Sequence, residues 1–325
     1  MKFKRWRVSA PIRDVNVGCA LCLSFLIAAC GGGSDEGQNS TPAAPEQAAP
    51  ANELPAVWST RSLEGPVVDM AASHGASPVL AIAYERDGLQ FFNFNAERIA
   101  APAPYDVKAL ADGHPATVAG ADMMIFPGLG ADNTLKAYLF GDGLLAPVEV
   151  ALPVEANNVA GLCSGATGFG DEDLFQVAYW TREASSELKT GRVSVVDEDF
   201  VWTDTGSTPS QAPIGACRFE AEGVSTTSDA VVDAAMLRRG DYEARVTIGI
   251  EGELFVTEPG DEPVRYSVRD GLSVRAPEEP TAIVAVGQPL GGGYPGGVII
   301  VSGEVAPDDY QAVFIDPSLL TLDKD

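Results

Sequence analysis

The sequence predicts an all-β protein, and within that class a β-propeller of five or six blades. Short runs rich in Val, Ile, Phe and Tyr recur about every ten residues with apolar and polar side chains in alternation. No stretch has the period of an amphipathic helix. Gly, Asp, Asn or Pro bounds most of the runs, and such turn-forming residues disfavour a helical bundle.

The expected strands follow from these runs. They are residues 79–84, 89–94, 117–126, 134–140, 174–180, 192–196, 230–237, 244–250, 253–257, 281–286, 297–302 and 310–315. Asp-Gly pairs at 87–88, 142–143 and 270–271 are typical of hairpin turns. Blades of roughly 40–50 residues would divide the folded part into five or six units, and two tandem β-sandwiches are the alternative.

The amino terminus predicts export. Residues 1–29 begin with a basic region and continue with an apolar stretch that is too short to span a membrane comfortably. The segment Leu26-Ile27-Ala28-Ala29-Cys30 resembles the lipobox of bacterial lipoproteins. That resemblance implies cleavage before Cys30 and attachment of lipid to its thiol. Gly31 stands where an Asp would retain a lipoprotein in the inner membrane, so we expect the outer membrane.

Three parts of the chain are therefore expected: a signal peptide at 1–29, a lipidated and disordered tether at 30–56, and a propeller domain at 57–325. The tether is rich in Gly, Ser, Pro, Ala and Gln and has almost no large apolar residue. Such a segment cannot bury enough surface to offset the entropy of ordering it.

Charge limits the partners. The formal net charge is −25, and the signal peptide contributes five basic residues and one acidic residue, so the remaining chain carries −29. So acidic a surface repels a phosphate backbone and excludes nucleic acid as a partner. The expected partners are the membrane, through lipid on Cys30, and another envelope protein.

Two cysteines of the folded part, Cys163 and Cys217, are expected to pair in an oxidising compartment, with two separately buried thiols as the alternative. A bridge closing a loop of this length contributes about 4 kcal/mol in the chain-entropy model. His74 and His114 lie in turn-like settings without the spacing of a zinc site or hydrolase triad, so we expect no catalytic role for them.

Several segments, taken in order, resemble those of one enzyme family. They are 67–74, which contains an Asp and a His, the strand pair 80–94, the hairpin 123–138, two segments that end in Cys at 159–163 and 214–217, and the strand 296–302. Together they resemble the β-propeller phytases, six-bladed enzymes that hydrolyse phytate with calcium ions. The resemblance covers most of residues 60–316.

The resemblance implies a site in which carboxylates hold calcium and cations clamp phosphate. Asp69 keeps the family's acid, and Arg86 stands beside the place of a family Lys, which makes Asp69 and Arg86 the candidate catalytic residues. Candidate calcium ligands are Asp69, Glu251 and Glu279. Other positions have lost their charge: a family Arg falls near Leu129 and a family Glu falls on Ile214.

These losses predict a binding or interaction module on an envelope lipoprotein, and not an enzyme. A divergent calcium-dependent phytase that uses Asp69, Arg86, Glu251 and Glu279 is the alternative. A structural component of an outer-membrane assembly is a further alternative.

Overall fold

A computed structural model gives the fold of residues 52–320, apart from 76, 87, 142, 168–172, 198, 221–222, 229–230, 241 and 291–292. The signal peptide, Cys30 and most of the predicted tether lie outside these described residues. Within them the structure is all-β, with one 3₁₀ turn at Pro317–Leu319. No helix in the described part of the chain is long and apolar enough to cross a membrane.

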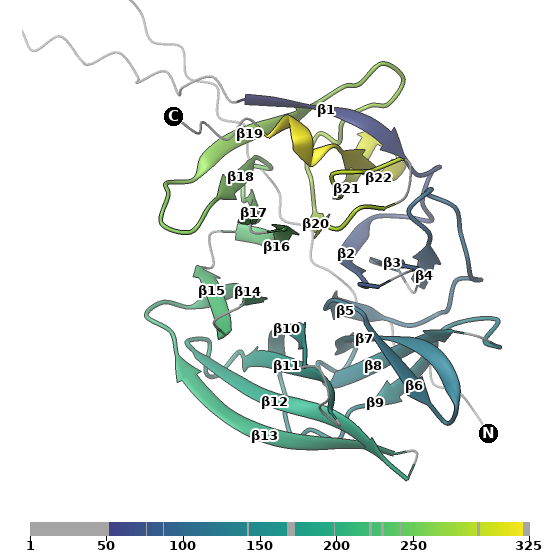
Figure 1. The fold of residues 1–325 in the computed structure, drawn as a ribbon, viewed down its shortest axis with the longest axis vertical. Coiled ribbons are helices and arrows are strands. Elements are labelled where there is room, and N and C mark those ends of the chain that lie inside the picture. The colour runs from purple at the N-terminus through teal and green to yellow at the C-terminus, as the bar shows by residue number, and fades with distance from the viewer. Residues whose placement is uncertain are drawn as a thin grey trace, which may run out of the picture. The chain divides into compact units, whose positions relative to one another are not determined.

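The strands form six blades around one axis (Figure 1). Blade I has β2 (Val67–Ala72), β3 (Leu80–Tyr84) and β4 (Gly88–Phe92). Blade II has β5 (Val107–Leu110), β7 (Ala121–Gly130), β8 (Leu135–Gly141) and β9 (Val148–Ala151), with β6 (His114–Val118) paired to β7. Blade III has β10 (Val159–Ala166), β11 (Asp173–Thr181), β12 (Glu187–Val196) and β13 (Asp199–Pro209).

Blade IV has only β14 (Ile214–Glu220) and β15 (Gly223–Ser228) among the described residues. Blade V has β16 (Val231–Arg239), β17 (Tyr242–Gly249), β18 (Leu254–Thr257) and β19 (Val264–Arg269). Blade VI has β20 (Ala282–Val286), β21 (Val298–Ala306) and β22 (Asp309–Ile315), completed by the amino-terminal strand β1 (Asn52–Ser59).

The all-β class and the six-bladed propeller predicted from the sequence are confirmed. Four of the six innermost strands, β2, β5, β10 and β14, are not among the strands that the sequence predicted. Inner strands crowd around the axis and therefore carry small residues, such as Gly161 and Ala216, that weaken the apolar alternation. The pair Asp270-Gly271 begins an irregular segment after β19 and does not form a hairpin, while Asp87 and Asp142 lie outside the described residues.

Strand β1 closes the ring. It pairs antiparallel with β22, where Ala56 lies opposite Ile315, and parallel with β19, where Leu54 lies opposite Val268. Leu54 and Ala56 are buried. Residues 52–56, which the sequence assigned to the tether, thus take part in the propeller, because ring closure supplies partners that their composition does not reveal.

Five apolar clusters fill the spaces between adjacent blades. They lie between blades V and VI, VI and I, I and II, II and III, and III and IV. Between blades IV and V the described residues form no such cluster. Arg218 reaches Asp233 and Arg245 reaches Glu220 across that space, with N–O distances of 3.4 and 3.1 Å. Blade IV is therefore held to blade V by ion pairs in place of an apolar core.

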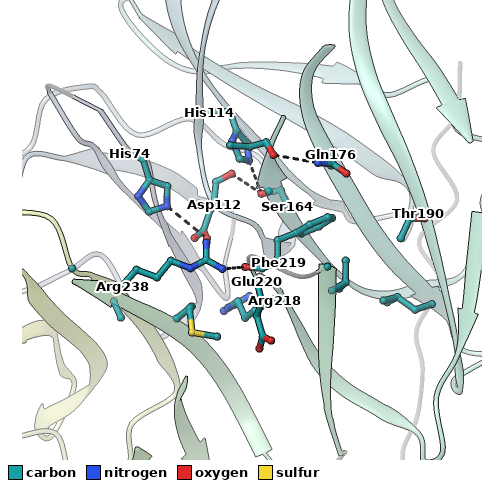
Figure 2. Close-up of a pocket in the computed structure, with 18 of the residues that line it drawn as sticks. His74, Asp112, His114, Ser164, Gln176, Thr190, Arg218, Phe219, Glu220 and Arg238 are labelled. Carbon is teal, nitrogen blue, oxygen red and sulfur yellow. Dashed lines mark hydrogen bonds and ion pairs between the residues drawn. The ribbon is translucent and has the colours of Figure 1, made fainter. Parts of the chain in front are cut away.

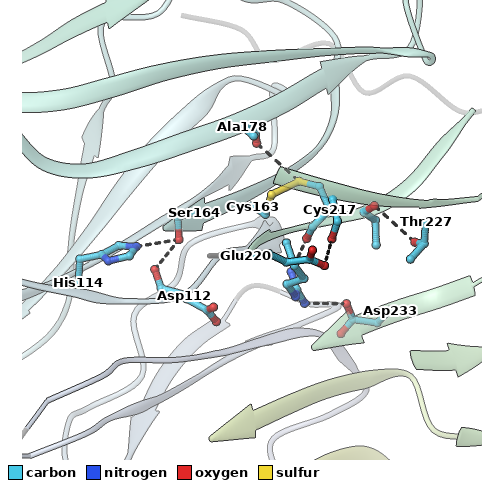
Figure 3. Close-up of a disulfide and its surroundings, with 12 residues drawn as sticks. Asp112, His114, Cys163, Ser164, Ala178, Cys217, Glu220, Thr227 and Asp233 are labelled. Atoms are coloured by element: carbon cyan, nitrogen blue, oxygen red, sulfur yellow. Dashed lines mark hydrogen bonds and ion pairs between the residues drawn. A yellow bond between two sulfur atoms is a disulfide. The ribbon is translucent and has the colours of Figure 1, made fainter. Parts of the chain in front are cut away.

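On its other side blade IV is held covalently. Cys163 on β10 and Cys217 on β14 form a disulfide with a Cα–Cα distance of 5.6 Å, as the sequence predicted (Figure 3). Both residues are buried in the apolar cluster between blades III and IV. Blade IV has only two strands among the described residues, and this bond fixes it to blade III.

We expect the double variant Cys163→Ala/Cys217→Ala to lose about 4 kcal/mol of unfolding free energy, because the bond closes a loop with a sequence separation of 54. Denaturant unfolding of the wild type and the variant, each with and without reductant, measures the loss. Reductant should lower the wild-type midpoint and leave the variant unchanged. An unchanged wild-type midpoint after proven reduction would contradict the assigned role.

Candidate functional site

The six inner strands β2, β5, β10, β14, β16 and β20 follow one another around a central channel. Their carboxyl ends surround one opening of it, which we call the mouth. A cavity of about 760 Å³ occupies the mouth and is lined by residues from all six blades (Figure 2). The closed ring is therefore needed to form this cavity, because no single blade contributes more than a part of its wall.

The lining of the mouth is mostly polar. Two guanidinium groups, from Arg218 and Arg238, and the imidazole of His74 face two carboxylates, from Asp112 and Glu220. Hydroxyl and amide groups of Ser, Thr and Gln complete the wall. Positive and negative groups are nearly balanced here, in a molecule whose surface is otherwise strongly acidic.

His74 and Asp112 form a pair at the edge of the mouth, with Nε2 of His74 4.0 Å from Oδ2 of Asp112. The interaction with Asp112 raises the pKa of His74, although burial opposes the charged imidazole. Burial also disfavours the Asp112 carboxylate, but His74 and the positive charge of Arg218 outweigh this and lower the pKa of Asp112. The pair therefore favours its charged form.

His114 is buried deeper, at the start of β6. Its ring stacks on Phe175 with the ring centres 5.2 Å apart, and its Nε2 lies 2.9 Å from Oγ of Ser164. Burial lowers the pKa of His114 to about 4, so the ring is neutral at pH 7. The Ser164 hydroxyl also lies 2.7 Å from the backbone oxygen of Asp112, to which it donates.

The direction of these hydrogen bonds bears on catalysis. A serine hydroxyl carries one proton, and Ser164 donates that proton to the Asp112 carbonyl. His114 must therefore be the donor to Ser164. A nucleophilic serine needs the opposite arrangement, in which the histidine accepts the hydroxyl proton. In this arrangement Ser164 and His114 tie blades II and III together.

A smaller cavity of about 180 Å³ lies at the other end of the channel, where the inner strands begin, and we call this end the base. Asp69 on β2 and Asp233 on β16 line it. Asp69 accepts the N–H groups of Met70 and of Leu110 in the next blade, both at 2.7 Å. Asp233 does the same with Ala234 and, in the next blade, Ile283, at 2.7 and 2.8 Å.

The two acids share a sequence signal as well as a geometry. Val67-Val68-Asp69 and Val231-Val232-Asp233 are identical, and a register irregularity falls at the same place in each strand. Each carboxylate is therefore a backbone bridge from one blade to the next, formed at equivalent positions of blades I and V.

Arg218 lies between the two ends of the channel and lines both cavities. Its Nη2 is 3.4 Å from Oδ1 of Asp233, and both side chains are largely buried. Burial and then the charge of Asp233 raise the pKa of Asp69, against the effect of Arg218. For Asp69 the hydrogen bond from the Leu110 N–H opposes this rise before Arg218 does, whereas for Asp233, whose pKa burial also raises, Arg218 is the first opposing cause. The positive charge of Arg218 thus offsets part of the free-energy cost of burying the carboxylates of Asp69 and Asp233 close to one another.

The structure places the predicted site residues on the base side of the propeller but does not gather them. Asp69 lies inside the channel, and Arg86 is exposed in the turn between β3 and β4. Glu251, in the turn between β17 and β18, and Glu279, before β20, are exposed on neighbouring segments: a Cβ atom on Gly252 would lie 3.8 Å from Cα of Glu279.

No three His, Cys, Asp or Glu side chains within the described part of the chain converge as a group that could hold a metal ion. Calcium binding by Asp69, Glu251 and Glu279, and a catalytic role for Asp69 and Arg86, stay predictions.

The mouth contains residues that the sequence did not single out. Ser164, Arg218 and Asp112 come from three different blades, and no motif joins them. His114, expected in a turn, begins a strand and is buried. At the base, the repeated Val-Val-Asp is the sequence signal that could have pointed to Asp233.

No protein-family model matches the sequence, and no curated protein matches it. Among solved structures, a six-bladed β-propeller lectin of Aleuria aurantia is 13% identical and aligns over 80% of this chain and 98% of its own, with a TM-score of 0.44. The β-propeller domain of Cps50 (Swd1) from Myceliophteria thermophila is 10% identical over 76% of this chain and 83% of its own, with a TM-score of 0.41.

Replacing Arg218 with Met should leave two buried carboxylates without their cation and cost about 3–5 kcal/mol of unfolding free energy near pH 8. The loss should shrink as the pH falls towards 4. Both acids have folded-state pKa values above the ordinary 3.8, so the folded protein binds more protons, and its stability falls as the pH rises through those values.

Denaturant unfolding at several pH values measures this dependence. Arg192→Met removes an exposed ion pair with Asp173 and is the matched control, expected to cost less than about 1 kcal/mol at every pH. If Arg218→Met lost as little unfolding free energy as the control, or if its loss grew as the pH fell, Arg218 would not offset the charge of Asp69 and Asp233.

Proposed function

We propose that this protein is a cell-envelope lipoprotein whose β-propeller binds a polar ligand in the mouth of its central channel and does not convert it. The observation that carries the proposal is the cavity of about 760 Å³ at the carboxyl ends of all six inner strands. Concave sites lined by a few converging polar groups are the usual places where proteins bind small molecules.

Four features favour binding over turnover. Ser164 donates its hydroxyl hydrogen to the Asp112 carbonyl, and this hydrogen bond competes with donation to His114. The oxygens of Asp69 and Asp233 already accept backbone N–H groups. The acids that the phytase resemblance nominated do not converge, among the described residues, as a group that could hold a metal ion. The cationic side chains of the mouth are also shared with carboxylates, as Arg238 is with Glu243 at 2.9 Å.

The envelope location rests on the sequence. The lipobox-like segment before Cys30 supports a lipid anchor, and Gly31 supports the outer membrane. The tether of small and polar residues would hold the propeller away from the bilayer. An envelope protein is the proposed partner of the displayed domain.

The order of the matching segments supports a distant relation to the β-propeller phytases, in which the charged positions of the enzyme have been lost. The competing activity is a calcium-dependent phosphatase that uses Asp69, Arg86, Glu251 and Glu279. Because these residues lie on the base side and the proposed ligand site lies at the mouth, the two functions can be separated by mutation.

We expect the purified chain to release no phosphate from phytate at any calcium concentration. The same preparation, screened by thermal shift against organic acids, phosphates and oligosaccharides, should be stabilised by a compound that binds at the mouth, because a ligand of the native state raises the melting temperature. Calcium-dependent phosphate release that Asp69→Ala abolishes would establish the enzyme and overturn the proposal.

Two variants on the same strand locate the binding site. Ala166, at the mouth end of β10, and Ala160, at its base end, are both exposed and line the two cavities. Ala166→Trp should block the stabilising compound, and Ala160→Trp should leave its binding unchanged. The reverse result would move the site to the base.

Lipid attachment is tested in a Gram-negative host by labelling cells with a palmitate analogue. The wild-type chain should carry the label and fractionate with the outer membrane, whereas Cys30→Ser should carry none, because the thioether forms at that thiol. Cys163→Ser is the control and should keep the label. An unlabelled wild-type chain would rule out the anchor.

A further inference from the structure

Trp58 on β1 is the only Phe, Tyr or Trp among the described residues whose side chain is exposed. Just over half of it, 52%, is open to solvent, and its Nε1 makes no hydrogen bond to another described residue. A half-exposed indole with a free N–H suits contact with a surface that has both apolar and polar groups. Trp58 therefore points to contact with something outside the propeller.

Exposed apolar side chains gather around one point of β1. That point is Ala56, which lies opposite Ile315 of β22 and packs against the backbone of Gly271, where an added Cβ atom would lie 1.8 Å from the Ala56 oxygen. Each of these three segments continues with a large apolar residue that is exposed. They are Val57 and Trp58 on β1, Leu272 after Gly271, and Leu319 in the turn after Ile315. We call these four residues the β1 patch.

The β1 patch lies on the rim of the propeller. In the sheet order β1 stands between β19 and β22, so it is the outermost strand of blades V and VI (Figure 1). The register shifts at Val57, and the side chains of Val57 and Trp58 are both exposed. Both also line a hollow of about 330 Å³ with Phe94 and Tyr294, which extends the apolar surface. A contact at the rim covers neither end of the central channel.

The charge near the patch is nearly balanced, although the chain as a whole is strongly acidic. Segments 52–64, 269–276 and 315–320, which contain the patch, carry four acids and three arginines, against 46 acids and 21 basic residues in the whole chain. Two of the acids are held in ion pairs and two accept backbone N–H groups; these are Glu53, Glu64, Asp270 and Asp316. Arg61 and Arg275 are exposed and form no ion pair with a described residue. This part of the surface therefore does not repel phosphate groups as the rest of the chain does.

The length of the chain before β1 identifies the surface that the patch can reach. Residues 31–51, which are 21 in number, separate Cys30, the expected lipid anchor, from the start of β1 at Asn52. A flexible chain of that length has a root-mean-square end-to-end distance of about 25 Å. Trp58 is a further stretch of about 20 Å along the extended strand. The surface of the bilayer that holds the anchor is therefore always within reach of the patch.

We propose that the β1 patch docks on the phospholipid surface to which Cys30 is anchored, so that the propeller stands on its rim. Trp58 and Leu272 enter the boundary between headgroups and acyl chains, where indole rings are favoured, and Arg61 and Arg275 contact phosphate groups. The mouth then faces the solvent at the side and stays open to its ligand. This inference rests on the lipid anchor of the proposed function. The bilayer is favoured over a protein partner because the tether keeps it within reach of every molecule.

The fluorescence of Trp58 tests the docking. The purified full chain is reconstituted in vesicles of phosphatidylethanolamine and phosphatidylcholine, with the phosphatidylcholine either unmodified or brominated in the part of its acyl chains nearest the glycerol. Flotation shows whether the vesicles carry the chain. The emission of Trp58, taken as the difference between the wild type and Trp58→Phe, should shift to shorter wavelength and lose most of its intensity in the brominated vesicles, because the ring lies among the lipids.

Two leucine variants locate the contact. Leu272→Ser should lower the ratio of docked to undocked chains about tenfold, measured by the quenching of Trp58, because it removes a large apolar side chain from the contact. Leu145→Ser is the matched control. Leu145 is 92% exposed in the turn after β8 of blade II, away from β1, so its replacement should leave the quenching unchanged.

Several results would overturn the docking. Vesicles that carry the chain while Trp58 is not quenched by brominated lipid would refute the docking and leave the anchor in place. Equal effects of Leu272→Ser and Leu145→Ser would mean that the contact is not made by the β1 patch. Protection of Trp58 from aqueous iodide without quenching by lipid would assign the patch to a protein partner or a second copy. A chain that does not float and carries no lipid label on Cys30 would overturn the anchor and the docking together.

Discussion

Bonds around the axis hold the six inner strands together, and every other feature of the structure depends on this ring. Each neighbouring pair of inner strands is joined by a side chain or a disulfide. The links are Asp69 to the Leu110 N–H, Ser164 to the Asp112 carbonyl, Cys163 to Cys217, Arg218 to Asp233, Asp233 to the Ile283 N–H, and Thr281 to the Val67 carbonyl. Apolar cores between blades add to these links on five of the six sides.

The boundary between blades IV and V has no apolar core among the described residues, and this explains why charged side chains are buried near the axis. Among the described residues the two strands of blade IV put their apolar side chains against blade III, and Arg218 and Arg245 form the ion pairs that span the space towards blade V. Taking charged groups out of water costs free energy that pairing only partly returns. The disulfide to blade III offsets part of that cost by limiting the freedom of the unfolded chain.

The polar mouth follows from the same arrangement. Inner strands meet at the axis with little room, so small residues occupy the strands themselves, and larger polar side chains lie where the strands end and the space widens. His74, Asp112 and Arg238 all follow or end such strands. With Arg218 and Glu220 included, the positive and negative groups of the mouth are nearly balanced, unlike the strongly acidic chain as a whole.

The sequence by itself determined the fold class, the approximate blade number and the disulfide, because period-two runs, turn residues and two leftover cysteines are local or countable signals. The sequence also predicted Asp69 as a site residue. In the structure both carboxylate oxygens of Asp69 accept hydrogen bonds from backbone N–H groups. Only the tertiary structure determined which residues line the cavity at the mouth. Ser164, Arg218 and Asp112 come from separate blades, and ring closure through β1 brings them together. Contacts between residues so distant in sequence depend on how whole blades pack, and no local pattern records that.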